Sequence, residues 1–236
     1  MPHTITDISY RKTPMTDAEE NEMRINYNKT KMILFNPGTA KDFHPRFNLS
    51  NNEIDLVDET KLLGVIVRSD LSWSSNTDYM VKRANKKLWF LRRLKKLGAN
   101  KEDLKDVYIN QIRSILEFAV PVWYSSFVGE DRLEIERVQK SALRIILGDS
   151  YVSYTSALRR TKLDSLFKRR QNLCSSFAVK CYKNKKFNAW FKPNSRQTQT
   201  RQTNKKLLSV YTRTVRYERS PISYITELLN RAKSIK

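Results

Sequence analysis

The sequence predicts an α+β chain, in which a small antiparallel sheet is followed by a mostly helical bundle. Three observations lead to this fold class. Residues 24–67 hold short apolar runs separated by turn signals, which is typical of strands. After Trp73, apolar residues recur every three or four positions, which is typical of helices that face a core. The 5 Gly and 7 Pro among 236 residues also disfavour a loop-rich or all-β architecture.

The predicted strands end at Val67. The run "KMILF" (31–35) is stopped by the turn signal "NPG", and an Asn-Asn turn separates "RFNLS" from "NEIDLV". The run "KLLGVIV" (61–67) is continuously apolar, so we expect one strand that is buried on both faces. Gly64 inside this run indicates either a bulge or a close approach of the backbone to another group.

The first predicted helix covers residues 78–97, and Gly98 is its expected C-cap. Five residues recur on its inner face: Val81, Ala84, Leu88, Leu91 and Leu94. A second helix starts near Lys101 and is stopped by Pro121.

The remaining predicted helices continue the bundle. A third covers residues 130–147, with Gly148 at its end and Leu133, Val138, Ala142 and Ile146 facing inward. A fourth follows Asp164 as its N-cap, with Leu166, Leu173, Phe177 and Cys181 at helical spacing. In the last segment, residues 207–230, we expect a strand, after which Ser220-Pro221 opens a terminal helix.

Positive charge dominates the composition. The chain carries 45 Lys and Arg against 24 Asp and Glu, for a formal net charge of +21. Such an excess strains a compact state by self-repulsion, and it favours a polyanionic partner. Nucleic acid is the first candidate and an anionic membrane surface is the second. The sequence has neither an apolar run of about 18 residues nor a signal peptide, so we expect an intracellular protein, nuclear or cytoplasmic, that does not span a membrane.

The residue types needed for common catalytic sites are scarce. The sequence has two histidines, His3 and His44, which are too few to complete a zinc site with Cys174 and Cys181. We therefore interpret the two cysteines as reduced thiols in a core. The sequence has no glycine-rich phosphate loop, and no two aspartates are adjacent, as clustered carboxylates for two metal ions would require. We therefore expect no enzymatic activity and no cofactor in this chain.

The best candidate binding surface is the basic helix at 78–97. Its cations are accompanied by one acid, Asp78, and we interpret them as phosphate contacts rather than as a merely solvated face. They are Lys82, Arg83, Lys86, Lys87, Arg92, Arg93, Lys95 and Lys96.

Aromatic residues and a second basic pair add further candidates. Four tryptophans could stack on bases: Trp73, Trp89, Trp123 and Trp190. Trp73 and Trp123 have apolar neighbours that favour packing, so Trp190, in "KKFNAWFKP", is the preferred stacking residue. Arg169 and Arg170 either contact phosphate or only flank their helix.

Six stretches, taken in order, resemble one protein family. They are "INYNKTKMILF" (25–35), "KLLGVIVRSDLSW" (61–73), "IRSILEFAVPVW" (112–123), "IERVQKSALRIILG" (135–148), "DSLFKRRQNL" (164–173) and "RYERSPISYITELLN" (216–230). Together they resemble the C-terminal region of reverse transcriptases from non-LTR retrotransposons (LINE elements) of the jockey type. Each stretch alone is a weak signal, but the six in this order cover about residues 23–231.

The resemblance implies a domain organisation and roles for several residues. Residues 1–22 would be a disordered or truncated edge, 23–74 a palm remnant with a primer-grip-like strand, and 75–191 a thumb-like domain. The composition of residues 192–206, which hold no apolar residue except Pro193, indicates a basic linker, and residues 207–236 would be a C-terminal strand and helix segment. Lys29 would lie near the incoming triphosphate, and Gly64 would bring its backbone to the primer terminus. The basic helix would track the template–primer duplex.

The chain also departs from the family pattern. The family's Phe/Tyr-Ala-Asp-Asp motif, whose aspartates would hold Mg²⁺, is absent from this sequence. The resemblance therefore implies a fragment that binds RNA or DNA without sequence specificity and has no polymerase activity of its own. Three alternatives stay open: a truncated gene model of an active RNA-directed DNA polymerase, a helical module that docks an acidic protein, and an unexpressed relic.

Overall fold

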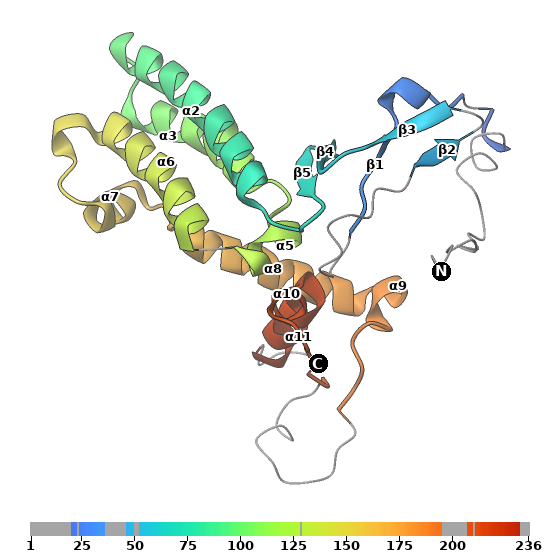
Figure 1. Ribbon diagram of the computed structural model, residues 1–236. Helices are drawn as coiled ribbons and strands as arrows, with labels where there is room; N and C mark the ends of the chain where they lie inside the picture. The colour runs from blue at the N-terminus through green and yellow to red at the C-terminus, as the bar shows by residue number, and fades with distance from the viewer. Residues whose placement is uncertain are drawn as a thin grey trace. The chain divides into compact units, whose positions relative to one another are not determined.

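The computed structural model describes residues 20–22, 24–35, 46–49, 52–127, 129–194, 207–209 and 211–231 (Figure 1). It confirms the predicted fold class, since small N-terminal sheets precede a mostly helical region. The chain divides into two compact units. Unit 1 comprises residues 1–62 and 67–71, and unit 2 comprises residues 63–66 and 72–236. The predicted N-terminal edge and basic linker lie largely outside the described residues.

Unit 1 contains a three-stranded sheet that is mixed rather than purely antiparallel. Its strands are β1 (Lys31–Met32), β2 (Phe47–Leu49) and β3 (Asn52–Leu56), in the order β1-β3-β2. β2 and β3 pair as the expected antiparallel hairpin, whereas β1 pairs with β3 in parallel. The chain between the parallel strands β1 and β3 passes through β2, and β3 lies between β1 and β2 in the sheet.

The run "KLLGVIV" forms a hairpin, so the prediction of one continuous strand was wrong. β4 (Glu59–Leu62) and β5 (Val65–Arg68) are joined by Leu63 and Gly64. Both turn residues have positive φ, +47° and +91°, as a two-residue type I′ turn requires. The expected burial on both faces is also wrong, because Leu63 is 89 % exposed and only Val65 of this run is buried.

Unit 2 contains the predicted helices, with small shifts of their ends. Its helical segments include α2 (Ser74–Lys96), α3 (Lys101–Val107), a π-helical turn (Tyr108–Arg113), α4 (Ser114–Leu116), α5 (Val120–Trp123), α6 (Gly129–Leu147), α7 (Tyr154–Thr161), α8 (Leu166–Lys183), α9 (Lys185–Asn188), α10 (Val215–Glu218) and α11 (Pro221–Arg231). α2 and α6 lie side by side, and α11 packs on α8 (Figure 1).

Two features of the helical region differ from the sequence prediction. Pro121 does not simply end the second helix: the chain turns at Ala119, where φ is +51°, and Pro121 then lies in the first turn of α5. This agrees with the tolerance of proline for a helix start, where its missing N–H costs no hydrogen bond. α7 was not predicted, since its eight residues are too few to show a clear period.

The main core of unit 2 is built on α2, α6 and the segment between them. Ala84, Leu88 and Leu91 are buried as predicted, and Val81 and Leu94 pack at the edge of the same cluster. On α6, Val138, Ala142 and Ile146 are buried as predicted.

Two residues predicted to face inward are instead on the surface. Leu133 of α6 is 55 % exposed, and Ile135 is buried in its place. Two residues differ by about 200° around a helix, so Leu133 lies nearly opposite Ile135. Phe177 of α8 is likewise exposed, whereas Cys174 and Cys181 are buried free thiols, as expected.

The start of α8 is stabilised by side chains from two helices. Ser165, rather than the predicted Asp164, is the N-cap, and its hydroxyl accepts from the backbone N–H of Lys168. The first two amides of α8 donate to side chains of α6: Leu166 N–H to Gln139 and Phe167 N–H to Glu136. The amide groups that a helix N-terminus leaves unpaired are therefore satisfied partly from outside the helix.

Candidate nucleic-acid interface

α2 is the element on which the candidate interface is built. It is 23 residues long and ends in a Schellman motif, in which Ala99 N–H donates to Leu94 C=O and Gly98 N–H donates to Lys95 C=O. Gly98 has φ +88°, which confirms it as the residue that ends the helix. This fixed end holds the last turn, where basic residues are concentrated, in a defined position.

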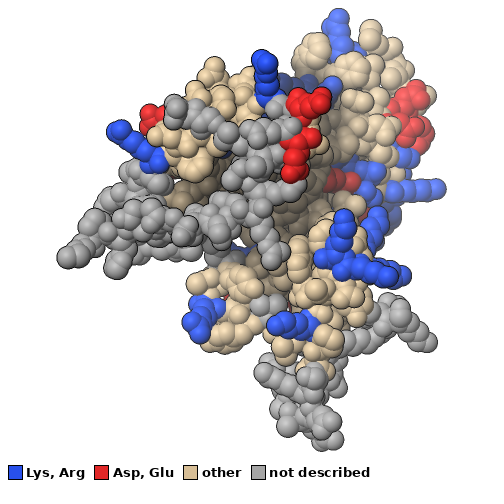
Figure 2. All heavy atoms as spheres, turned by 90° about the vertical axis from the view of Figure 1, so that its right-hand side faces the viewer, with Lys and Arg blue, Asp and Glu red and all other residues tan. Residues whose placement is uncertain are grey.

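The eight cations of α2 that are predicted phosphate contacts are all exposed. Four of them lie on the side opposite to the buried residues of the helix: Lys82, Lys86, Arg93 and Lys96. Basic residues in the last turn also interact favourably with the helix dipole, which explains part of this distribution. The dipole does not explain the four cations in the middle of the helix: Lys82, Arg83, Lys86 and Lys87. Figure 2 shows one face of the molecule, with Lys and Arg (blue) at more places than Asp and Glu (red).

Lys95 is an exception among the eight, because the fold already uses its charge. Its ammonium donates to the carbonyl of Ile145 in the last turn of α6. The C-terminal ends of α2 and α6 therefore lie together, and the Lys95 cation lies where both helix dipoles are negative. Gly148 follows α6 with φ +54°, and a Cβ there would approach the Lys95 ammonium to 2.5 Å. We therefore assign Lys95 to the helix contact and not to phosphate binding.

Two exposed aromatic residues lie among these cations. Trp89 is 65 % exposed, and the neighbouring Phe90 is also exposed. Trp73 and Trp123 are buried in the main core, as their sequence context predicted. The sequence does contain a signal for Trp89: it falls in step with Lys82, Lys86, Arg93 and Lys96 at helical spacing, on the side opposite to Leu88 and Leu91.

Arg169 takes part in an ion pair within unit 2. Its guanidinium pairs with Glu117 through two hydrogen bonds, of which Nη2 to Oε2 is 2.9 Å. The Glu117 hydrogen bond raises the pKa of Arg169, so the cation is stable in this position. This bidentate contact occupies the groups that would bind phosphate, and Arg169 is better explained as structural.

Arg170 cannot be a phosphate contact in this fold, because its side chain is fully buried. Its Nη2 lies 3.4 Å from Oε1 of Glu136, and its guanidinium lies 5.7 and 5.9 Å from the ring centroids of Tyr124 and Phe127. Burial lowers the pKa of Arg170, and the nearby Glu136 opposes that effect. Of the two alternatives that the sequence left for Arg170, its burial therefore disfavours a phosphate contact and favours a structural role.

Trp190, the residue that the sequence favours for base stacking, lies just after α9. It is 53 % exposed, and its ring centroid lies 5.0 Å from that of Phe187 in a tilted arrangement. Lys185, Lys186 and Lys192 nearby are exposed. Trp190 therefore stays a candidate, but its ring already has an aromatic neighbour in Phe187.

Gly64 approaches a side chain of its own unit. A Cβ at this position would lie 3.1 Å from the Phe118 ring. The close approach that the sequence suggested is therefore present, although it is made to Phe118, and the bulge alternative is replaced by the type I′ turn.

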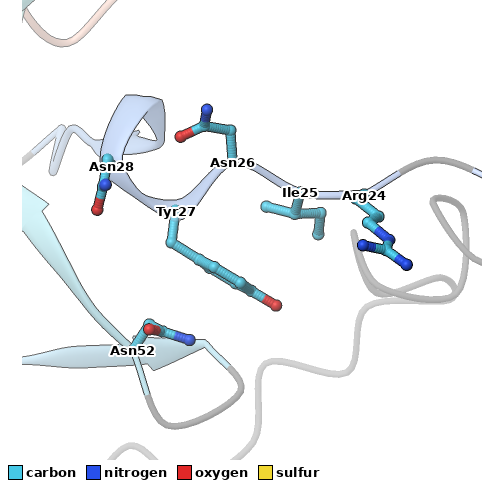
Figure 3. A pocket seen from close by; sticks show the side chains of 6 residues that line it. All are labelled: Arg24, Ile25, Asn26, Tyr27, Asn28 and Asn52. Carbon is cyan, nitrogen blue, oxygen red and sulfur yellow. The ribbon is translucent and has the colours of Figure 1, made fainter.

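Lys29 belongs to unit 1, where it is exposed at the end of the 3₁₀ turn Tyr27–Lys29. An open pocket of about 480 Å³ lies beside this turn (Figure 3). Six residues line it: Arg24, Ile25, Asn26, Tyr27, Asn28 and Asn52. Lys29 is not among the residues that line this pocket.

Within the described residues, no His, Cys, Asp and Glu side chains gather in a group of three that could hold a metal ion. No described helix is long and apolar enough to cross a membrane. Burial raises the pKa of the Cys174 thiol to about 12, so this cysteine is held as a neutral thiol.

No protein-family model, no curated protein and no solved structure matches this chain.

Proposed function

We propose that this chain binds nucleic acid without sequence specificity, and that the exposed face of α2 makes the phosphate contacts. One observation carries the proposal: α2 presents seven exposed cations other than Lys95, with Asp78 as the one acid of the helix. Lys and Arg that contact phosphates supply the affinity of non-specific binding by releasing condensed counterions. Such contacts require long basic side chains on an accessible surface, which this face provides.

The order of the six family-like stretches supports a more specific version of the proposal. In that version the chain is the C-terminal part of a retroelement-derived reverse transcriptase, and its partner is RNA or DNA, including template–primer duplex. Binding is the activity assigned here, because the sequence has no adjacent aspartates to hold the two Mg²⁺ ions of polymerase chemistry. The transcript upstream of Met1 tests this version. A continuous frame with a Phe/Tyr-Ala-Asp-Asp motif would make the whole product a polymerase.

A charge-reversal experiment tests the binding surface. In the variant K82E/K86E/R93E/K96E, four exposed cations on one side of α2 become acidic. We expect the Kd for a single-stranded RNA to rise more than tenfold. The slope of log K against log salt should fall by about 3, since each lost single-strand phosphate contact removes about 0.7. Fluorescence anisotropy at several salt concentrations measures both quantities.

A matched control separates the α2 face from net charge. The variant K101E/R159E/K183E/K192E makes the same change in net charge at four exposed positions of unit 2 outside α2. We expect it to weaken binding by a small factor and to leave the salt slope nearly unchanged. If both variants weaken binding equally, binding is spread over the whole basic surface, and the assignment to α2 is wrong.

A further inference from the structure

Trp89 has an unusual environment for a tryptophan. It is 65 % exposed on a helix whose other outward residues are mostly charged, and it lies outside the core clusters of unit 2. Burial of an aromatic ring of this size contributes strongly to stability, so leaving Trp89 in solvent forgoes that contribution. Its position therefore calls for an explanation other than packing within the described part of the chain.

The spacing of α2 places Trp89 in the middle of a cationic row, which we call the Trp89 row: Lys82, Lys86, Trp89, Arg93 and Lys96. With 100° per residue, the five side chains fall within about 80° of arc on the side opposite to Ala84, Leu88 and Leu91. At 1.5 Å per residue the row is about 21 Å long. Two cations therefore lie on each side of one exposed indole.

From this arrangement, and resting on the proposed function, we infer that the Trp89 row is a site for single-stranded nucleic acid, in which a base stacks on Trp89 and the flanking cations contact phosphates. At the stacked rise of about 3.4 Å per nucleotide, 21 Å accommodates about six nucleotides. Combining an aromatic platform with basic residues along the backbone path is the general solution for binding single strands without reading sequence.

The indole favours a single strand over a duplex for a geometric reason. In a duplex, each base already stacks on its neighbours, so an external ring reaches a base face only if a step is opened, at a cost of a few kcal/mol. In a single strand, the base faces are accessible and every base offers one. A duplex would use the cations of the row but not Trp89, so the two nucleic acids should respond differently to a change at this residue.

Single substitutions in the full-length chain test the stacking role. We expect Trp89→Ala to raise the Kd for a 16-nucleotide single-stranded RNA at least fivefold, and Trp89→Phe to keep it within about twofold. The salt slope should not change, because the phosphate contacts remain. The Kd for the same strand annealed to its complement should change less than twofold. Phe177→Ala, which removes an exposed aromatic ring on α8, is the matched control.

Tryptophan emission gives a direct readout of the ring. In a Trp190→Phe background, Trp73 and Trp123 are buried, so Trp89 is the exposed emitter of the chain. We expect the single strand to quench this emission and the duplex to leave it nearly unchanged.

Each contrary result has a distinct meaning. If Trp89→Ala binds the single strand as tightly as the parent chain while K82E/K86E/R93E/K96E weakens it, stacking on Trp89 is refuted and the proposed function stands. If Trp89→Ala weakens single strand and duplex equally, the preference for a single strand is refuted. If Trp190→Ala lowers affinity and Trp89→Ala does not, the stacking site is at α9. If the charge reversal also has no effect, the proposed function itself fails.

Discussion

The buried pair of Arg170 and Glu136 yields a sharp prediction about stability. Arg170 is fully buried, and Glu136 is the acidic partner at 3.4 Å. Glu136 also accepts hydrogen bonds from the Tyr154 hydroxyl and the Phe167 amide. Glu136→Gln removes the negative charge and replaces one acceptor oxygen with a donor, while the Arg170 cation remains in the core. Leaving a buried charge without its partner costs about 3–5 kcal/mol, and we expect a loss in that range.

Removing the cation should cost less. In Arg170→Met the remaining carboxylate keeps its hydrogen bonds from Tyr154 and Phe167, and a linear apolar chain fills much of the space between Tyr124 and Phe127. We expect a loss of about 1–3 kcal/mol. We expect the double variant to lose about 1–3 kcal/mol less than the sum of the two single losses. Once Arg170 is replaced, removing the charge of Glu136 leaves no buried cation without a partner.

Urea-induced unfolding at pH 7, followed by far-UV circular dichroism, measures these free energies. The control pair is Lys168 and Asp164, which are joined at the exposed start of the same helix. Lys168→Met and Asp164→Asn should each stay within about 1 kcal/mol of the parent chain. A loss below about 1 kcal/mol for Glu136→Gln, or strict additivity in the double variant, would refute the reasoning.

Two further predictions concern the turn and the thiol. Leu63→Asn should raise the free energy of unfolding by about 0.5–1 kcal/mol, because asparagine accepts the positive φ of a type I′ turn and leucine does not; a lower urea midpoint would contradict this. The Cys174 thiol has a pKa of about 12 in the folded chain and about 9 in the unfolded chain. The unfolded state therefore loses the proton first, and the free energy of unfolding falls as the pH rises from 9 to 12. Cys174→Ala should make that decline shallower by at most about 1.4 kcal/mol per pH unit, as unfolding measured at pH 8, 9.5 and 10.5 will show.

Much of the helical region could be predicted because its signals are local. The inner face of α2 repeats apolar residues at helical spacing, and Gly98 and Gly148 follow α2 and α6 as C-terminal glycines should. The turn at Leu63 gave no such signal, since leucine is not a residue that turn chemistry selects. Sequence reasoning therefore extended one strand through a position where the chain reverses.

The errors at basic residues have a different origin. Arg170 stands in "FKRRQ", which resembles a solvated charge run, and its acceptor Glu136 lies 34 residues earlier. Lys95 follows Leu88 and Leu91 at helical spacing, which places it on the buried side of α2, but its acceptor Ile145 lies 50 residues later. Periodicity along one helix therefore indicates on which side a cation lies, but it does not identify the distant group that engages the cation. Only the periodic part of the candidate site, the exposed row on α2, could be predicted from the sequence.

The first turn of α8 has a consequence for the order of folding. Two of its amides are paired with Gln139 and Glu136, which lie 27 and 31 residues earlier, so an isolated α8 segment lacks those partners. Closing a loop of that length carries an entropic cost before the contact forms. We therefore expect a peptide of residues 164–183 to be weakly helical, and the start of α8 to form cooperatively with α6 during folding. Substitutions at Gln139 and at Ser165 should then change the activation free energy of folding by similar fractions of their effect on the free energy of unfolding, the ratio that transition-state analysis reports.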